Sequence, residues 1–306
     1  MVADMKRAVI ISLAVVAVIC IAWLMVRSKR SNHPTREPLM TRDVTVLTRH
    51  LCKPAILVVK TQEPTASYFG GAPPSYPGFV WPIKDGHPLS FLACFSCAEL
   101  PRRSELDWLP QSGFLLFFYD LANQPSGFEP KDRGGWKTIY ISPETKLSDS
   151  PAIPPQVLTK EAVLPKKFVK FTATELPPSP ETDEIASLGL SEKERDAFID
   201  YRSMLYGDQP NHQIGGYPDP VQNPDMDLEC QLASHGLYLG DPTGYRDPRA
   251  AALRPGARDW SLLFQMDFDD DLGVMWGDAG MIYFWVRRED ARARNFENTW
   301  LVLQCC

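Results

Sequence analysis

The sequence lacks the short motifs that mark the commonest enzyme classes. It contains no Gly-x-Ser-x-Gly nucleophile elbow, no phosphate-binding loop, no Rossmann fingerprint and no His-Glu-x-x-His zinc motif. Positively charged residues are fewer than negatively charged ones: the chain has 32 Lys and Arg and 38 Asp and Glu, which gives a net charge of -6. These absences argue against the common hydrolases, against nucleotide-dependent enzymes and against a nucleic-acid partner.

Cysteine and histidine are sparse, with 7 and 5 in 306 residues. Cys94 and Cys97 have CxxC spacing, but a zinc site needs a second ligand pair, and the adjacent Cys305 and Cys306 suit one metal ion poorly. We expect Cys94 and Cys97 to lie in one strand, where residues i and i+3 point to opposite faces. The pair is therefore interpreted as buried structural thiols, and no cofactor is expected.

One long uncharged run stands near the start of the chain. Residues 8–26 hold no charge, and as a helix they would be about 28 Å long, close to the thickness of a bilayer core. We predict a transmembrane helix between a flank (residues 1–7) and a basic linker (residues 27–40). A cleaved signal peptide is the alternative, but Val26-Arg27-Ser28 offers no small-x-small cleavage site. Basic residues are more numerous after the run, which favours a single-pass cell-membrane protein with a cytoplasmic globular domain.

The rest of the chain, residues 41–306, is expected to form a globular domain organised around residues 259–286. In this stretch, residues 260–268 and 281–286 are rich in aromatic and β-branched side chains, and an acidic turn joins them. The pattern predicts a β-hairpin. Because nearly every residue of both strands is apolar, both faces of the hairpin should be covered.

An earlier part of the chain has the same pattern. A glycine pair, Gly70-Gly71, comes before apolar residues 89–98 and aromatic residues 114–119, just as Gly215-Gly216 comes before the two runs of the hairpin. We interpret this as an internal duplication, with halves at about 65–120 and 212–290. The predicted fold class is α+β: antiparallel β-sheets from two pseudo-repeated halves, with a few flanking helices, after one transmembrane helix. The clearest of these helices follows the capping box at Ser191 and Glu194.

Two groups of residues could carry chemistry. If the glycine-rich corners pack together, His212 could meet Asp278 and act as an oriented general base. The alternative is that His212 only packs against a turn. Asp267, Asp269 and Asp271 alternate as in a calcium loop, but Leu272 replaces the required glycine and strands flank the loop, which excludes an EF-hand. An irregular cation site or a solvated acidic turn remains.

A series of ordered motifs resembles the YwqG-like family of bacterial domains of unknown function. The motifs are FGGAPPSYPGFVWP, PLSFLACFSCAELP, GFLLFFYD, HQIGGYPDPVQ, the strand-like residues 228–232, WSLLFQMDFDD and MWGDAGMIYFWV. The resemblance covers residue 41 to the carboxyl terminus and implies an α+β fold with similar halves, but no established activity. The family usually lacks a membrane anchor and usually has glutamine where Cys94 stands.

The positions shared with that family are mainly turn glycines and aromatics. We predict that they form a surface for a protein partner or small ligand between the halves, although the aromatics could instead cap the core. The predicted contact residues are Gly70, Gly71, Trp81, Tyr217, Trp276 and Gly277. The predicted function is a membrane-anchored binding module. The alternative is a metal-dependent or His-Asp hydrolytic enzyme centred on His212 and Asp278, and the sequence leaves open whether the protein is an enzyme.

Overall fold

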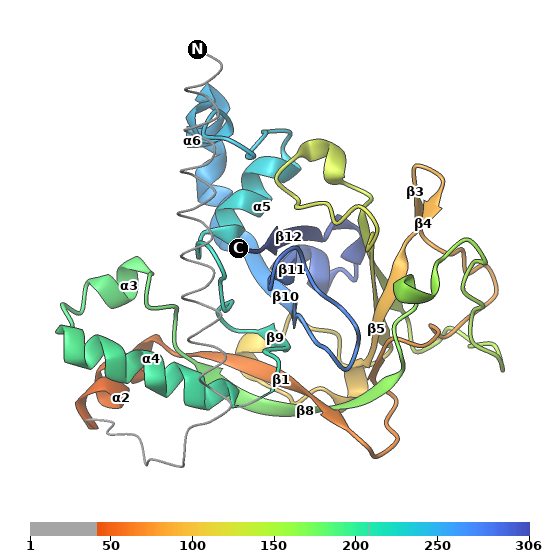
Figure 1. The fold of residues 1–306 in the computed structure, drawn as a ribbon, viewed down its shortest axis with the longest axis horizontal. Coiled ribbons are helices and arrows are strands. Elements are labelled where there is room, and N and C mark those ends of the chain that lie inside the picture. The colour runs from red at the N-terminus through yellow and green to blue at the C-terminus, as the bar shows by residue number, and fades with distance from the viewer. Residues whose placement is uncertain (1–41, 208) are drawn as a thin grey trace, which may run out of the picture.

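A ten-stranded antiparallel sheet runs through the molecule, in the order β12-β11-β10-β9-β1-β8-β2-β5-β6-β7 (Figure 1). The structure is a computed structural model, and it describes residues 42–207 and 209–306. The strands of this sheet are β1 (Lys53–Thr61), β2 (Tyr68–Phe69), β5 (Ser90–Ser96), β6 (Phe114–Tyr119), β7 (Trp136–Ile141), β8 (Lys167–Leu176), β9 (Gln213–Gly215), β10 (Trp260–Asp267), β11 (Met281–Arg287) and β12 (Trp300–Gln304). A separate hairpin consists of β3 (Ile83–Lys84) and β4 (His87–Pro88).

The long strands β1 and β8 form the middle of the sheet. They pair from Lys53 opposite Leu176 to Thr61 opposite Phe168. On one side, β8 leads to the first strand group, which we define as β2, β5, β6 and β7. On the other side, β1 leads to the second strand group, β9, β10, β11 and β12. The central pair therefore carries one hydrogen-bond ladder across the whole molecule.

The two strand groups share their irregularities as well as their order. The register shifts between Phe91 and Ala93 in the β5–β6 pair, and between Leu262 and Phe264 in the β10–β11 pair. Gly113 stands before β6 and Gly280 before β11. A Cβ atom on these glycines would lie 2.2 Å and 2.3 Å from a carbonyl oxygen of the next strand. The two strand groups are therefore alike in strand order and in these local irregularities.

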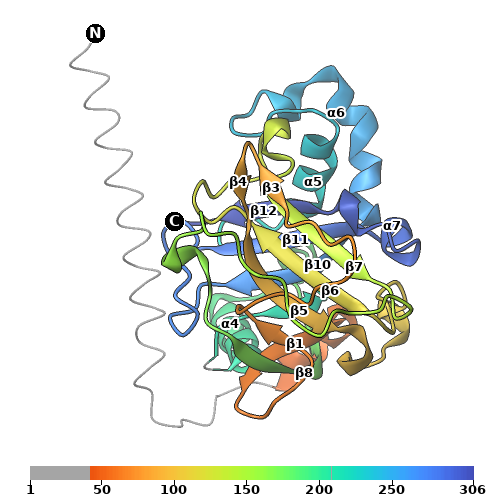
Figure 2. The ribbon, with the colours of Figure 1, turned by 90° about the vertical axis from the view of Figure 1, so that its right-hand side faces the viewer.

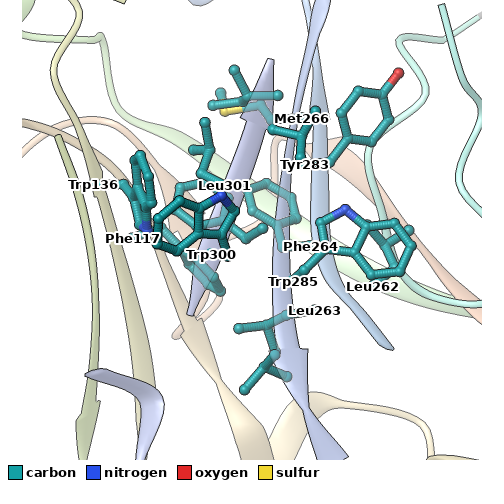
Figure 3. Packing of buried hydrophobic residues seen from close by; sticks show 14 of the residues in the cluster. Phe117, Trp136, Leu262, Leu263, Phe264, Met266, Tyr283, Trp285, Trp300 and Leu301 are labelled. Carbon is teal, nitrogen blue, oxygen red and sulfur yellow. The ribbon is translucent and has the colours of Figure 1, made fainter. Parts of the chain in front are cut away.

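The core lies where the two strand groups face each other (Figure 3). The ring centroid of Phe117, from β6, is 4.9 Å from that of Phe264 and 5.2 Å from that of Phe284. The edges of the sheet also meet. Trp136 of β7 lies against Trp300 of β12, with 5.1 Å between ring centroids, and its indole N–H donates to the carbonyl of Thr299 at 2.9 Å. The sheet is therefore strongly curled, and both faces of the β10–β11 hairpin are buried, as the sequence predicted.

The helices lie at two separate ends of the molecule (Figure 2). At one end, α2 (Arg42–Thr48), α3 (Asp183–Ala186) and α4 (Glu192–Tyr206) share a small core of Val44, Ile185 and Phe198. The capping box that predicts α4 is confirmed, with Ser191 and Glu194 bonded in both directions. At the other end lie α5 (Met226–Ser234) and α6 (Pro248–Leu253), and α7 (Arg288–Arg292) follows β11.

The predicted fold class is wrong in two respects. The fold is mostly antiparallel β with few helices, and the strands belong to one nearly closed sheet instead of separate sheets from two halves. The physical reason is the long β1–β8 ladder, which joins both strand groups and which the repeat pattern does not contain. Residues 228–232, interpreted as a strand, lie in α5, because a short apolar run is compatible with either element.

The predicted membrane span, residues 8–26, lies outside the described residues, as do its flank (residues 1–7) and the linker (residues 27–40). Within residues 42–207 and 209–306, no helix is both long enough and apolar enough to cross a bilayer. The transmembrane helix, the membrane as partner, the single-pass localisation and the cytoplasmic placement of the domain thus receive no support from the structure and are not retained.

Candidate functional site

A groove of about 600 Å³ opens at the end of the sheet where β1 and β10 begin and β9 and β11 end. We call it the Tyr217 groove. Its walls come from seven segments: residues 53–54, 105–108, 179–184, 215–218, 224–227, 258–262 and 285–288. Its volume lies within the range of about 300–1,000 Å³ that is usual for small-molecule sites. The 105–108 segment belongs to the connection between β5 and β6, so both strand groups contribute to the groove.

Large aromatic side chains form much of the groove wall. Trp108, Trp260 and Trp285 line it and are buried. Trp285 lies opposite Leu262 across the β10–β11 pair, and the two side chains are adjacent in Figure 3. The indole N–H of Trp260 donates to Gln231 at 2.9 Å, whereas the buried indole N–H of Trp285 has no hydrogen-bond partner among the residues that the structure describes. The three tryptophans therefore form an apolar part of the groove wall, which contains one unpaired donor.

Three fully buried glutamines hold the loop after β9, residues 216–223, against the sheet. The Nε2 group of Gln213 donates to the carbonyls of Gly215 and Tyr217, at 3.0 and 2.6 Å. Gln265 and Gln304 bind the loop further along. Gln265 Oε1 accepts from Asp219 N at 2.8 Å, and Gln304 Oε1 accepts from Val221 N and Gln222 N at 3.1 and 3.0 Å. The loop that carries Tyr217 is thus ordered by its own contacts.

Acidic side chains outnumber basic ones around the groove. The acidic residues are Glu105, Glu181, Asp183, Glu184, Asp225 and Asp227, and the basic ones are Lys53, Arg258 and Arg288. Burial, with a contribution from Asp225, raises the pKa of the Asp227 carboxyl. Desolvation lowers the pKa of Lys53, although Glu184 and Asp227 act in the opposite direction. The Lys53 ammonium lies 3.8 Å from the centre of the Tyr217 ring.

His212 lies in a buried network beneath the sheet surface and is outside the groove lining. Its Nδ1 atom accepts a hydrogen bond from Asp267 N at 3.1 Å, and its Nε2 atom is 3.2 Å from Asp269 Oδ2. Because Nδ1 accepts, Nε2 carries the proton and donates to Asp269. Both ring nitrogens are therefore engaged, and the ring has no free lone pair with which to act as a general base.

Asp278, the predicted partner of His212, is exposed, and its backbone carbonyl accepts from Cys306 N. The carboxylate that His212 contacts is that of Asp269. Burial opposes ionisation of Asp269, but the hydrogen bonds from His212 and Lys60, together with the charge of Lys60, outweigh it and lower the pKa to about 2. The glycine-rich corners do not bring His212 and Asp278 together, because Gly277 packs against Cys305 while Gly216 packs against Ala55.

The acidic turn surrounds a lysine. Lys60 Nζ is 2.8 Å from Asp269 and 2.6 Å from Asp271, whereas Asp267 accepts from Asn211 N at 2.9 Å. In the described part of the chain, no group of three or more His, Cys, Asp or Glu residues is placed to hold a metal ion. These three aspartates thus stabilise the β10–β11 turn and the start of β9.

Of the six predicted contact residues, only Tyr217 lines the groove. Gly71 donates to the carbonyl of Leu164 at 2.8 Å, and a Cβ on Gly70 would lie 2.3 Å from the Pro165 carbonyl. Trp81 packs edge-on against Phe118, which is the core-capping alternative. Trp276 is fully buried against Tyr119, and Gly277 donates to Gln124. The sequence did not indicate Trp260 or Trp285 as site residues, because their apolar pattern is that of any buried strand.

The groove has a smaller counterpart in the first strand group. Ser90 pairs with Tyr119 as Ser261 pairs with Val286, so Ser90 and Ser261 are equivalent. Ser90 lines a pocket of about 400 Å³, together with Asp120, Gly273 and Met275. The groove around Ser261 is larger because α3 and residues 224–227 extend its walls. Each strand group therefore has a pocket beside the equivalent serine, and the one beside Ser261 is larger and lined by more charged residues.

Comparison with known families gives one match. The family described as a domain of unknown function (DUF1963) matches residues 67–305. This range contains both strand groups and β8 but not β1. No curated protein matches the chain. The finer YwqG-like name stays a resemblance.

Proposed function

The chain belongs to the DUF1963 family, a domain of unknown function, and we propose that it is a binding module that takes its ligand in the Tyr217 groove. The observation that carries the proposal is the groove itself, about 600 Å³ in volume, with buried tryptophans in its wall and a polar, charged rim. Ligand sites usually combine aromatic or apolar side chains with polar groups that orient the ligand, and this groove offers both. Trp108 comes from the connection between two strands of the first group, and Trp260 and Trp285 come from the second group, so the ligand would contact parts of both.

The groove is prepared for binding before a ligand arrives. Gln213, Gln265 and Gln304 fix the loop that carries Tyr217, and all three amides are buried. A loop that is already ordered loses little conformational freedom on binding, and more of the contact energy then contributes to affinity. This supports recognition of a ligand by a rigid surface, with little rearrangement of the protein.

The hydrolytic alternative has no comparable support. Its proposed base, His212, uses both ring nitrogens within the protein and is 2% exposed, and its proposed partner, Asp278, lies elsewhere. The aspartates proposed as metal ligands hold Lys60 and Asn211. A chemical step at these residues would first require the buried network to open.

The proposal is tested by panning the full chain against a display library of random peptides and measuring the selected peptides by isothermal titration calorimetry. We expect binding with one-to-one stoichiometry that weakens at least about tenfold in Tyr217→Ala, which removes a groove side chain. Tyr238→Ala is the matched control, since Tyr238 is an exposed tyrosine outside the groove lining. Selected ligands that bind both variants equally well would place the site elsewhere, and the proposal would fail.

A further inference from the structure

We propose that the ligand of the Tyr217 groove is an extended peptide segment whose side chains carry positive charge. This inference rests on the proposed function, because it assigns a chemical class to the occupant of that same groove. Three features of the groove lead to it: the excess of carboxylates on the rim, a cation already seated on an aromatic ring, and a buried donor without a partner.

The charges of the groove are unequal in number and different in origin. Six acidic residues line it against three basic ones. The acidic residues stand on segments that flank the sheet: residues 181–184 at α3, residues 225 and 227 at α5, and Glu105. The basic residues, Lys53, Arg258 and Arg288, stand at or beside the ends of the strands. None of the six carboxylates forms an ion pair with a lysine or arginine of the described residues. The flanking walls therefore attract positive charge, and complementary potentials of this kind select partners and speed association.

The groove already holds one cation in this way. The ammonium of Lys53 lies over the Tyr217 ring, and Glu184 and Asp227 favour its charged form. An aromatic face together with nearby carboxylates is a recognised way to bind an ammonium or guanidinium group. Asp183, Asp225 and Glu105 are exposed and offer carboxylates for further cations.

A peptide backbone would also supply a hydrogen-bond acceptor for the unpaired indole N–H of Trp285. Trp285 is 5% exposed and lines the groove, and its buried indole N–H has no acceptor within residues 42–207 and 209–306. Such a buried donor is costly to leave unpaired. A peptide carbonyl supplies the acceptor that a simple metal cation lacks. Arg288 also lines the groove. Its guanidinium donates to Ser261 and to the Arg258 carbonyl, so it is a second hydrogen-bond donor, after Trp285, that favours carbonyl or carboxylate oxygens.

Calorimetric titration of the full chain with three capped peptides of equal length tests this inference. One peptide alternates glycine with lysine, the second carries acetyl-lysine in place of lysine, and the third carries glutamate. We expect the lysine peptide to bind at least about tenfold more tightly than the other two, and its affinity to fall steeply as salt is added. Trp285→Phe keeps the ring but removes the N–H, and we expect it to weaken the lysine peptide several-fold.

Two further variants locate the charge effect. Glu184→Gln with Asp227→Asn removes two groove carboxylates with little change of shape, and we expect it to weaken the lysine peptide about tenfold or more. Glu63→Gln, an exposed acidic residue outside the lining, should leave the affinity unchanged. Equal binding of the lysine and acetyl-lysine peptides, or no effect of the double variant, would overturn the cationic class. If a neutral or acidic peptide binds instead and Tyr217→Ala abolishes that binding, the groove remains the site and only the ligand class is wrong.

Discussion

Tyr68 on β2 and Gln213 on β9 form the same hydrogen bond in the two strand groups. Tyr68 Oη donates to the carbonyl of Ala72 at 2.9 Å, and Gln213 Nε2 donates to the carbonyl of Tyr217 at 2.6 Å. Each bond reaches four residues along the chain, across a glycine pair. Two chemically different side chains thus order the same turn.

The strand groups differ at the positions equivalent to the other two glutamines, Gln265 and Gln304. Cys94 pairs with Tyr68 as Gln265 pairs with Gln213, and Ile141 pairs with Phe114 as Gln304 pairs with Met281. Cys94 and Ile141 have no amide, so they cannot bind a loop as the glutamines do. The second strand group alone therefore holds its turn by three amides, and the larger groove opens beside this turn.

The first prediction concerns Gln213. Replacement by alanine removes the donor from two carbonyls at the wall of the groove. We expect Gln213→Ala to lower the free energy of unfolding by about 2 kcal/mol and to speed amide hydrogen exchange in residues 216–223. Gln156→Ala is the control, because Gln156 is exposed and lies outside this loop, and it should change stability by less than about 0.5 kcal/mol. Unchanged exchange in Gln213→Ala would show that the amides do not order the loop.

The second prediction concerns the equivalent glycines Gly113 and Gly280. A Cβ on either would lie within 2.3 Å of a backbone carbonyl oxygen, which has little room to move. We expect Gly113→Ala and Gly280→Ala each to cost about 3 kcal/mol, measured by urea unfolding, since overpacking a rigid contact typically costs 1–3 kcal/mol and occasionally more. Gly273→Ala is the control: Gly273 has a positive φ, but no atom lies within 4 Å of its added Cβ. A larger loss in the control would contradict the close approach.

Much of the sheet could be predicted from local pattern alone. The runs that become β5, β6, β10 and β11 are dense in aromatic and β-branched residues, and the structure confirms each of them. Cys94 and Cys97 are both buried, in different core clusters, as predicted, although only Cys94 lies in the strand and Cys97 begins the short 3-10 helix after it. The predicted α4 also forms, because its capping box is a local feature. Such elements depend on neighbouring residues, which a single sequence shows.

The site could not be predicted in the same way because it depends on contacts between distant segments. Lys53, Trp108, Glu184 and Trp260 meet only because β1 pairs with both β8 and β9 and thereby brings their ends together. Nothing local in the sequence indicates that pairing. His212 was placed beside Asp278 because both lie near glycine corners, but the antiparallel β9–β10 pairing instead brings it to Asp269. Short-range pattern thus identified important residues without identifying their partners.

The third prediction concerns the buried pair of His212 and Asp269. The folded-state pKa of Asp269, about 2, is below its ordinary value of 3.8. The carboxylate therefore contributes stability above pH 4, and this contribution is lost as the pH falls towards 2. We expect Asp269→Asn to lower the free energy of unfolding by about 2 kcal/mol at pH 7, with a smaller difference at pH 3. Asp271→Asn removes the other carboxylate bound to Lys60.

Comparing Asp269→Asn with Asp271→Asn separates the effect of a buried carboxylate on stability from that of an exposed one. The Asp271 side chain is 64% exposed and the Asp269 side chain 2%, although both contact Lys60. An exposed ion pair contributes less than about 1 kcal/mol, so Asp271→Asn should have a small effect at every pH. Chemical denaturation of both variants between pH 3 and pH 7 checks this. Equal losses in the two variants would mean that the hydrogen bond to His212 contributes nothing measurable.

The fourth prediction concerns Glu229, a buried carboxyl on α5. Its Oε1 atom accepts from Asn223 at 2.9 Å and from Tyr245 at 3.3 Å, whereas Oε2 has no partner in the described part of the chain. Burial raises the pKa to about 7, with the two hydrogen bonds acting in the opposite direction. The folded protein therefore holds this proton to higher pH than the unfolded chain does. The contribution of this raised pKa to stability is therefore fully present below about pH 4.5 and is lost as the pH rises through 7.

Glu229→Gln removes this titration while keeping an oxygen that accepts from Asn223 and Tyr245. We expect the difference in unfolding free energy, variant minus parent, to rise by about 2–3 kcal/mol between pH 5 and pH 8, as measured by urea unfolding at each pH. Glu289→Gln alters an exposed glutamate on α7 and should show no such rise. A parent protein whose stability is the same at pH 5 and pH 8, with a Glu229→Gln variant that follows it in parallel, would mean that Glu229 is ionised at both pH values. The carboxylate would then need a partner for Oε2, which a small rotation towards solvent could provide.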